Sequence, residues 1–161
     1  TITWGMNCDT GEVIEVIEQY YHLGITFERF INTGAFGDTV PGTSTITVSG
    51  SPGSITQVEV YFESDFTPTD ALTVSLTSPE GTTVVLTDGN GGAAQPINTV
   101  TFTDSATTPI AGSSGVRSGL YQPEEALSGF AGEDADGTWT LTLATASAVS
   151  GTLDNWSLAL R

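Results

Sequence analysis

Residues 137–160 constrain the fold most strongly, because they contain one alternating pattern twice. A tryptophan followed by two leucines at alternate positions occurs in residues 139–143 and again in residues 156–160, with Thr, Ser or Ala in between. This period of two is typical of half-buried β-strands. Ser150-Gly151-Thr152 lies between the two segments and predicts a turn. We therefore expect the two strands to pair as an antiparallel hairpin and to send both indoles toward one core.

Further alternating segments predict strands along most of the chain. They are residues 1–4, 26–31, 45–48, 58–63, 72–77, 82–87 and 100–102. The segments on either side of Ser78-Pro79-Glu80-Gly81 predict a hairpin, because proline and glycine favour this turn. Residues 12–23 fit either a short helix or a strand, and we favour the strand because they are rich in Val, Ile and Tyr. Residues 104–118 and 122–137 are expected to be long loops.

The number of strands and the absence of a clear helix indicate an all-β fold. Eight or more short strands at near-regular spacing are typical of a two-sheet β-sandwich, and the long connections favour jelly-roll topology. The length of 161 residues predicts a single domain. Cys8 is the only cysteine, so no disulfide can form within the chain.

The charge of the chain excludes several classes of partner. Nineteen acidic residues and three arginines give a formal net charge of −16. Nucleic acids and anionic membranes are recognised by clustered cations, so neither is expected as a partner. No apolar run is long enough to span a membrane, so membrane insertion is not expected either.

The sequence contains no motif for catalysis. His22 is the only histidine and lies in an apolar segment, so we interpret it as a structural residue and not as the base of a serine protease. Neither a Gly-x-Ser-x-Gly motif nor a Cys/His cluster with zinc spacing occurs. A carboxylate pair for glycoside hydrolysis stays open, because the sequence does not give the separation of the acids. We assign no catalytic residue.

Calcium is the ligand that the composition favours, because Ca²⁺ binds carboxylate, carbonyl and amide oxygens gathered in loops. The candidates, in order of preference, are Glu133 with Asp134 and Asp136, then Asp9 with Glu12, then Asp88 with Asn90. In the first group, alternate acids on an irregular loop can converge on one ion before the next strand begins. Solvated loop acids without an ion are the alternative at each place.

Three motifs resemble a known family when they are taken in order. They are Asp70–Thr82 with its Ser-Pro-Glu-Gly-Thr turn, Gly129–Gly132, and Gly137–Leu158 with its Gly-Thr-Trp and Gly-Thr-Leu-Asp-Asn-Trp-Ser-Leu segments. Together they resemble the P domain, also called P/Homo B, which follows the subtilisin-like catalytic domain in proprotein convertases and many secreted bacterial proteases. The resemblance covers residues 38–161. We therefore expect residues 1–37 to add N-terminal strands to a jelly roll formed by residues 38–161.

The resemblance implies a non-catalytic jelly roll that stabilises or regulates an attached serine-type endopeptidase, often in association with calcium. It implies the catalytic or surface domain of the parent protein as partner. Residues 11–27 also resemble the opening of β-sandwich domains in exported bacterial surface proteins, which implies a secreted or extracellular location, at the cell surface or in the medium. The chain departs from the P-domain pattern at Ala71, where members carry an aspartate, and at residues 144–149, where they often carry acids.

Two other functions stay open. Jelly rolls are common lectin scaffolds, so the chain could be a carbohydrate- or surface-binding module whose loops contact a protein or glycan ligand. The aromatic residues that could stack on sugars are Trp4, Tyr20, Tyr21, Tyr61 and Tyr121. A stand-alone hydrolase is the second alternative.

Overall fold

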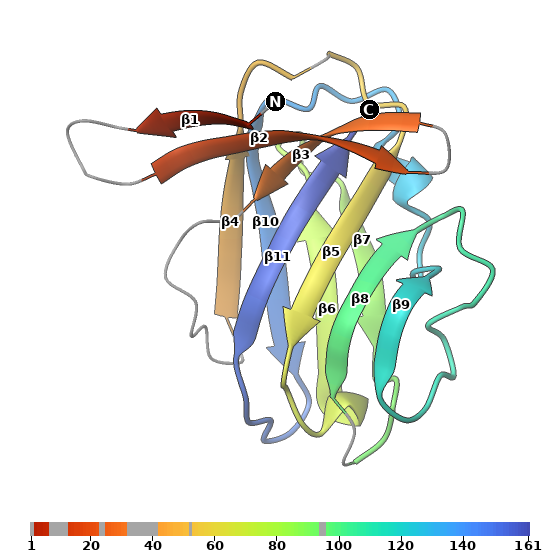
Figure 1. Ribbon diagram of the computed structural model, residues 1–161. Coiled ribbons are helices and arrows are strands. Elements are labelled where there is room, and N and C mark those ends of the chain that lie inside the picture. The colour runs from red at the N-terminus through yellow and green to blue at the C-terminus, as the bar shows by residue number, and fades with distance from the viewer. Residues whose placement is uncertain (1, 7–12, 23–24, 32–41, 52, 94–95) are drawn as a thin grey trace.

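The protein is a two-layer β-sandwich in the computed structural model, which describes residues 2–6, 13–22, 25–31, 42–51, 53–93 and 96–161 (Figure 1). The strands in these ranges are β1 (Ile2–Met6), β2 (Val13–His22), β3 (Ile25–Ile31), β4 (Gly42–Val48), β5 (Val58–Ser64), β6 (Leu72–Thr77), β7 (Thr83–Asp88), β8 (Ile97–Thr103), β9 (Arg117–Tyr121), β10 (Gly137–Thr145) and β11 (Leu153–Leu160). Two short 3-10 helices, η1 (Thr69–Ala71) and η2 (Leu127–Phe130), complete the described elements. The predicted all-β fold is confirmed.

The strands form two sheets between which the chain crosses repeatedly. The larger sheet has the order β1-β2-β3-β11-β5-β8-β9, and the smaller has the order β4-β10-β6-β7. The chain changes sheet after β3, β4, β5, β7, β9 and β10, which supplies the crossovers that a jelly roll requires. Residues 13–22 are a strand, as favoured, and β1, β2 and β3 extend the larger sheet beyond β11. The division at residue 38 stays a prediction.

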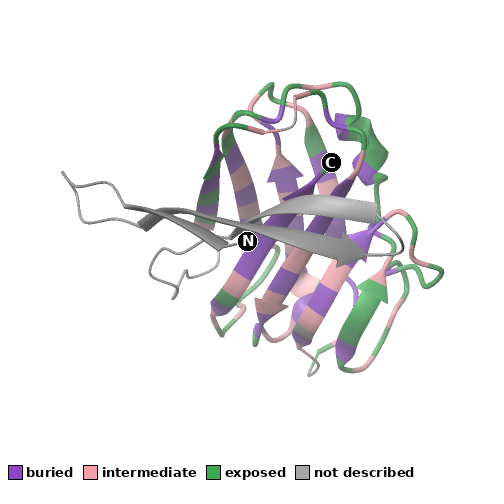
Figure 2. Cartoon of the chain, turned by 45° about the horizontal axis from the view of Figure 1, so that its top comes forward, coloured by how far each residue is buried: buried purple, intermediate pink, exposed green. Residues whose placement is uncertain are grey.

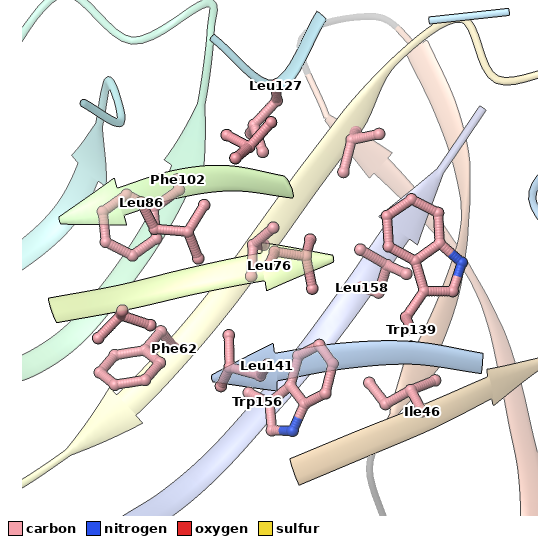
Figure 3. Packing of buried hydrophobic residues seen from close by; sticks show 14 of the residues in the cluster. Ile46, Phe62, Leu76, Leu86, Phe102, Leu127, Trp139, Leu141, Trp156 and Leu158 are labelled. Carbon is pink, nitrogen blue, oxygen red and sulfur yellow. The ribbon is translucent and has the colours of Figure 1, made fainter. Parts of the chain in front are cut away.

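The core lies between the two sheets and is built from the alternating residues (Figure 3). Trp139 and Trp156 are fully buried, as predicted. The indole nitrogen of Trp139 donates to the carbonyl of Ala135 at 3.0 Å, and that of Trp156 donates to the hydroxyl of Ser44 at 3.0 Å. The ring of Phe130 meets Trp139 edge to face, with 5.1 Å between centroids. Each buried indole therefore has both apolar neighbours and a polar partner.

The predicted hairpin of β10 with β11 is wrong, because the two strands lie in opposite sheets. β10 pairs with β4 and β6, whereas β11 pairs with β3 and β5. The connection crosses between the sheets beside Thr67, whose backbone exchanges hydrogen bonds of 2.8 and 2.9 Å with Ser150. Two strands with the same alternation can cover one core from opposite sides. The alternation therefore identifies the inward face of a strand but does not determine to which sheet the strand belongs.

The first predicted long loop runs into a strand at residue 117, and the second contains a short helix. Residues 117–121 form β9, which pairs in parallel with β8, and residues 127–130 form η2. β9 was missed because it lacks apolar alternation and contains Gly119 at φ +99°. Beyond β9, the backbone N–H groups of Glu124 and Glu125 donate to carbonyls of β7 at 3.1 and 3.0 Å. These residues cover an edge that would otherwise present unpaired groups.

The two tryptophan strands differ in how their outer faces are covered (Figure 2). On β10, Thr138 is exposed, which agrees with a solvent-facing row of threonines. On β11, Ser157 is 1% exposed and Ala159 is 6% exposed, although the alternation places them on the outer face. Glu59 of β5, which pairs with Ala159, is also buried. Residues 156–160 of β11 are therefore buried on both faces.

Candidate functional site

Three connections meet at one end of the sandwich, and we call this region the acidic end. They are residues 49–57 before β5, the turn 78–82 before β7, and residues 131–136 before β10. Its acidic residues are Glu80, Glu133, Asp134 and Asp136. The backbone N–H of Ile55 donates to the carbonyl of Glu133 at 2.9 Å, and that of Asp134 donates to Glu80 Oε1 at 2.8 Å. The first predicted calcium site thus lies where distant loops are joined.

The three carboxylates of that site engage separate partners. Glu133 Oε1 accepts a hydrogen bond from the hydroxyl of Thr82, and Asp134 Oδ1 accepts from the backbone N–H of Asp136 at 3.0 Å. Glu133 Oε2 is buried and has no hydrogen-bond partner among the described residues. Within the described ranges, no three His, Cys, Asp or Glu side chains are grouped to share a metal ion. The structure therefore does not bring the three together around one point, and calcium binding stays a prediction.

Asp136 joins the acidic loop to the connection before β5. Its Oδ1 accepts from the backbone N–H of Ser51 at 2.9 Å, and its Oδ2 accepts from that of Gly50 at 3.3 Å. The Ser51 backbone contributes most to lowering the pKa of Asp136, and the Ser51 side chain and the Gly50 N–H lower it further, while desolvation opposes them. The ionised carboxylate is therefore a clasp between two loops.

Of the other predicted cation ligands, the structure describes only Asp88 and Asn90. Asp9 and Glu12 fall outside the described residues. Asp88 and Asn90 lie at the opposite end of the sandwich, where Asp88 is the last residue of β7 and Asn90 follows the strand. The Thr73 hydroxyl donates to Asp88 Oδ1 at 2.6 Å. Asp88 is therefore already engaged across the β6–β7 pair.

Asn90 is the centre of a buried polar network that sequence analysis considered only as a cation ligand. Its Nδ2 donates to Glu124 Oε1 at 2.6 Å and to Thr87 Oγ1 at 3.1 Å, and its Oδ1 accepts from the backbone N–H of Gly112 at 2.8 Å. Asn90 is 7% exposed. This one side chain therefore joins the end of β7 to two connections that flank β9.

A buried arginine lies next to this network and was missed by sequence analysis. Arg117 is fully buried, and its Nη2 donates to Thr69 Oγ1 at 2.7 Å. Burial lowers the pKa of Arg117, and the charge of Tyr121 acts in the opposite direction. Gly91 lies so close that a Cβ built on it would be 1.5 Å from Arg117 Nη1. The scarcity of arginine in so acidic a chain was the one available signal.

The glycines of the two Gly-Thr segments are required by close packing. Gly137 has φ +130°, and a Cβ on it would lie 2.7 Å from Cβ of Pro79. Gly151 has φ +126°, and a Cβ on it would lie 2.6 Å from Asp65 Oδ1 and 2.7 Å from Cα of Phe66. A side chain at either position would meet both backbone strain and a steric clash. These motif residues therefore act in the fold.

The tyrosines proposed for sugar stacking have structural contacts where the structure describes them. The Tyr61 hydroxyl donates to Glu63 Oε2 at 2.9 Å, and Tyr121 packs partly buried against the core. The side chains of Trp4, Tyr20 and Tyr21 are outside the described part of the structure, as is that of His22 in β2. Neither described helix is long and apolar enough to cross a membrane.

Comparison with known proteins identifies the family. No curated protein matches the chain. Solved structures that share similarity with it include the serine protease of Aeromonas sobria, with 19% identity and a TM-score of 0.45, and the same protease in complex with the chaperone ORF2, with 19% identity and a TM-score of 0.48. In both cases the match covers 84% of this chain and 26% of the other. The model of the proprotein convertase P-domain matches residues 55–160, well over half of the sequence, and the chain belongs to that family.

Proposed function

We propose that this chain is a non-catalytic, extracellular module that stabilises or regulates the catalytic domain of a secreted serine protease. The observation that carries the proposal is the P-domain match over residues 55–160, which include strands β5 to β11 and so parts of both sheets. The motif residues of this region have structural roles. The indoles of Trp139 and Trp156 fill the core, and Gly137 and Gly151 allow close packing. No catalytic role is needed to explain them.

The charge distribution supports docking to a basic surface. Acidic side chains are exposed at both ends of the sandwich, including Asp134 and Asp136 at one end and Asp70 and Asp88 at the other. Arg117, in contrast, is withdrawn into the interior. A partner domain with clustered arginine or lysine would be attracted to such a surface and oriented by it.

The decisive experiment starts from the gene that encodes this segment. We expect a subtilisin-like catalytic domain in the same polypeptide. That polypeptide should be expressed with and without residues 1–161, because β3 pairs with β11, and its melting temperature and peptidase activity compared. The shortened protein is expected to melt lower or to lose activity, while the isolated 161-residue chain hydrolyses no peptide, ester or glycoside. Equal stability and activity of the two forms would contradict the proposal.

A gene that encodes an adhesin or surface anchor in place of a protease would redirect the proposal to a surface-binding module. A glycan array would then separate the carbohydrate-binding alternative from protein binding. Binding of the chain to a defined glycan would favour the carbohydrate-binding alternative, and a blank array would remove it.

A further inference from the structure

Asn90 and Gly91 form the only Asn-Gly sequence among the 161 residues. In such a pair the glycine nitrogen can attack the asparagine side-chain carbonyl, because glycine has no side chain to hinder the approach. A bond forms between this nitrogen and Cγ, the Cγ–Nδ2 bond breaks, and ammonia leaves with the proton of the glycine amide. Water then opens one of the two C–N bonds of the cyclic imide, and the product is aspartate or isoaspartate.

We propose that Asn90 is a site of deamidation, that its hydrogen-bond network controls the reaction, and that the new carboxylate releases this network irreversibly. The nitrogen that leaves as ammonia is the atom that donates to both Glu124 and Thr87. Both hydrogen bonds must therefore be lost during imide formation. Because the side chain is only 7% exposed, the reaction follows local opening of this end of the sandwich.

The product cannot restore the network. A carboxylate at position 90 has no N–H group to donate to Glu124 Oε1, which lies 2.6 Å from the present nitrogen. Two carboxylates at that separation repel each other, and position 90 is buried although Glu124 is exposed. The segment that carries Glu124 covers the edge of β7, so the repulsion acts to loosen this cover.

Isoaspartate extends the effect to the buried arginine. It inserts one additional atom into the backbone between positions 90 and 91 and therefore displaces Gly91. Gly91 lies against the guanidinium of Arg117, which donates to Thr69. Deamidation at Asn90 thus disturbs the hydrogen bonds of Asn90 and also the hydrogen bond between Arg117 and Thr69.

The rate of deamidation tests the first part of the proposal. The complete 161-residue chain is incubated in warm, mildly alkaline buffer, and peptide mass mapping follows aspartate and isoaspartate at Asn90. Asn155, which precedes the bulky Trp156, serves as the internal reference. Glu124→Ala is expected to accelerate the reaction at Asn90 by about 10- to 150-fold, the range expected for losing a hydrogen bond to a charged group. The matched variant Glu124→Gln retains an acceptor and should accelerate it less. Equal rates in the original chain and Glu124→Ala would overturn the proposal that the hydrogen bonds of Asn90 control its deamidation.

The stability of the product tests the second part. Aged chain that carries the new charge is separated by anion exchange, and its melting temperature is compared with that of fresh chain. We expect a lower melting temperature, and we expect the same change in Asn90→Asp. Adding Glu124→Gln to Asn90→Asp should recover part of the loss, since it removes one of the two charges. Unchanged melting of the aged chain would overturn the proposed release, whether or not the variants fold.

Discussion

β10 and β11 contain nearly the same alternating sequence and differ in their surroundings. Each strand contributes an indole and leucines to the core, from opposite sheets. On the other face, β10 presents Thr138 to solvent, whereas Ser157 and Ala159 of β11 are buried. A period of two therefore specifies one buried face of a strand, and the rest of the fold decides the second face.

The indoles, which the two strands share, should give the largest effects. Trp139→Ala and Trp156→Ala are each expected to lower the free energy of unfolding by about 3–5 kcal/mol, because a buried aromatic ring leaves a cavity. Urea denaturation measures the change. Trp139→Phe and Trp156→Phe are the matched controls, since they remove the hydrogen bonds to Ala135 and Ser44 but keep an aromatic ring and so leave a smaller cavity. A loss below about 1 kcal/mol for either alanine variant would show that the strand does not belong to the core.

Charged substitutions on the outer faces should give the next largest effect and should differ between β10 and β11. Ser157→Asp is expected to cost about 3 kcal/mol, because it buries a charge whose cross-strand neighbours, Ile31 and Tyr61, are uncharged. Thr138→Asp, on the exposed face of β10, should change stability by no more than about 0.5 kcal/mol. Both are measured by urea denaturation under the same conditions. Equal costs would abolish the distinction between the strands.

Gly137 and Gly151, which begin the two Gly-Thr segments, allow the same comparison between the chain segments that lead into β10 and β11. Gly151→Ala is expected to cost about 2–3 kcal/mol, because the new Cβ would strike backbone atoms of Phe66. Gly137→Ala should cost less, since its closest contact is the ring of Pro79. Gly81→Ala is the control: its φ is +94° and no atom lies within 4 Å of a Cβ there. If Gly81→Ala cost as much as Gly151→Ala, backbone strain alone would explain the effect.

Calcium, if it binds at the acidic end, should stabilise the loop that leads into β10. With calcium tenfold above its dissociation constant, the gain would be about 1.4 kcal/mol by linkage. EDTA should then lower the melting temperature, and added Ca²⁺ should restore it. Glu133→Gln should remove this response, while Asp88→Asn at the opposite end should keep it. No shift at millimolar calcium would reject the site.

The smallest effect is expected from the clasp of Asp136. Hydrogen bonds hold the pKa of Asp136 below its ordinary value, so folding favours the ionised form. Its contribution is therefore complete above the ordinary aspartate pKa and is lost as the pH falls through the lower folded value. Asp136→Asn should melt slightly below the original chain at neutral pH, and the two should converge in acid. A difference that persists unchanged in acid would show that the charge is not involved.

The sequence was informative wherever a single strand or turn decided the outcome. The inward faces of the strands, the buried tryptophans and the turn at residues 78–82 follow from local patterns. The pairing of β10 and β11 could not be obtained in this way, because it depends on a crossover to the other sheet. β9 was also beyond local patterns, since Arg117 is its buried residue and its apolar Leu120 is exposed.

The candidate site was less predictable for the same reason. Loop acids were expected to converge on a cation, but the direction of Asp136 depends on backbone amides at residues 50 and 51, in another loop. Asn90 likewise depends on Glu124 and Gly112. Contacts between residues so far apart in the chain produce no periodic pattern in the sequence. They form only when the two sheets are assembled.

The place of β11 also bears on how the protein is made. Of the eleven described strands it leaves the ribosome last, yet it lies between β3 and β5 in the larger sheet. During synthesis these two strands have no neighbour on the side that β11 will occupy, and their exposed edges invite pairing with other chains. β11 can insert between β3 and β5 only after residue 160 has been translated. The yield of native protein will therefore depend on what protects β3 and β5 from pairing with other chains until then.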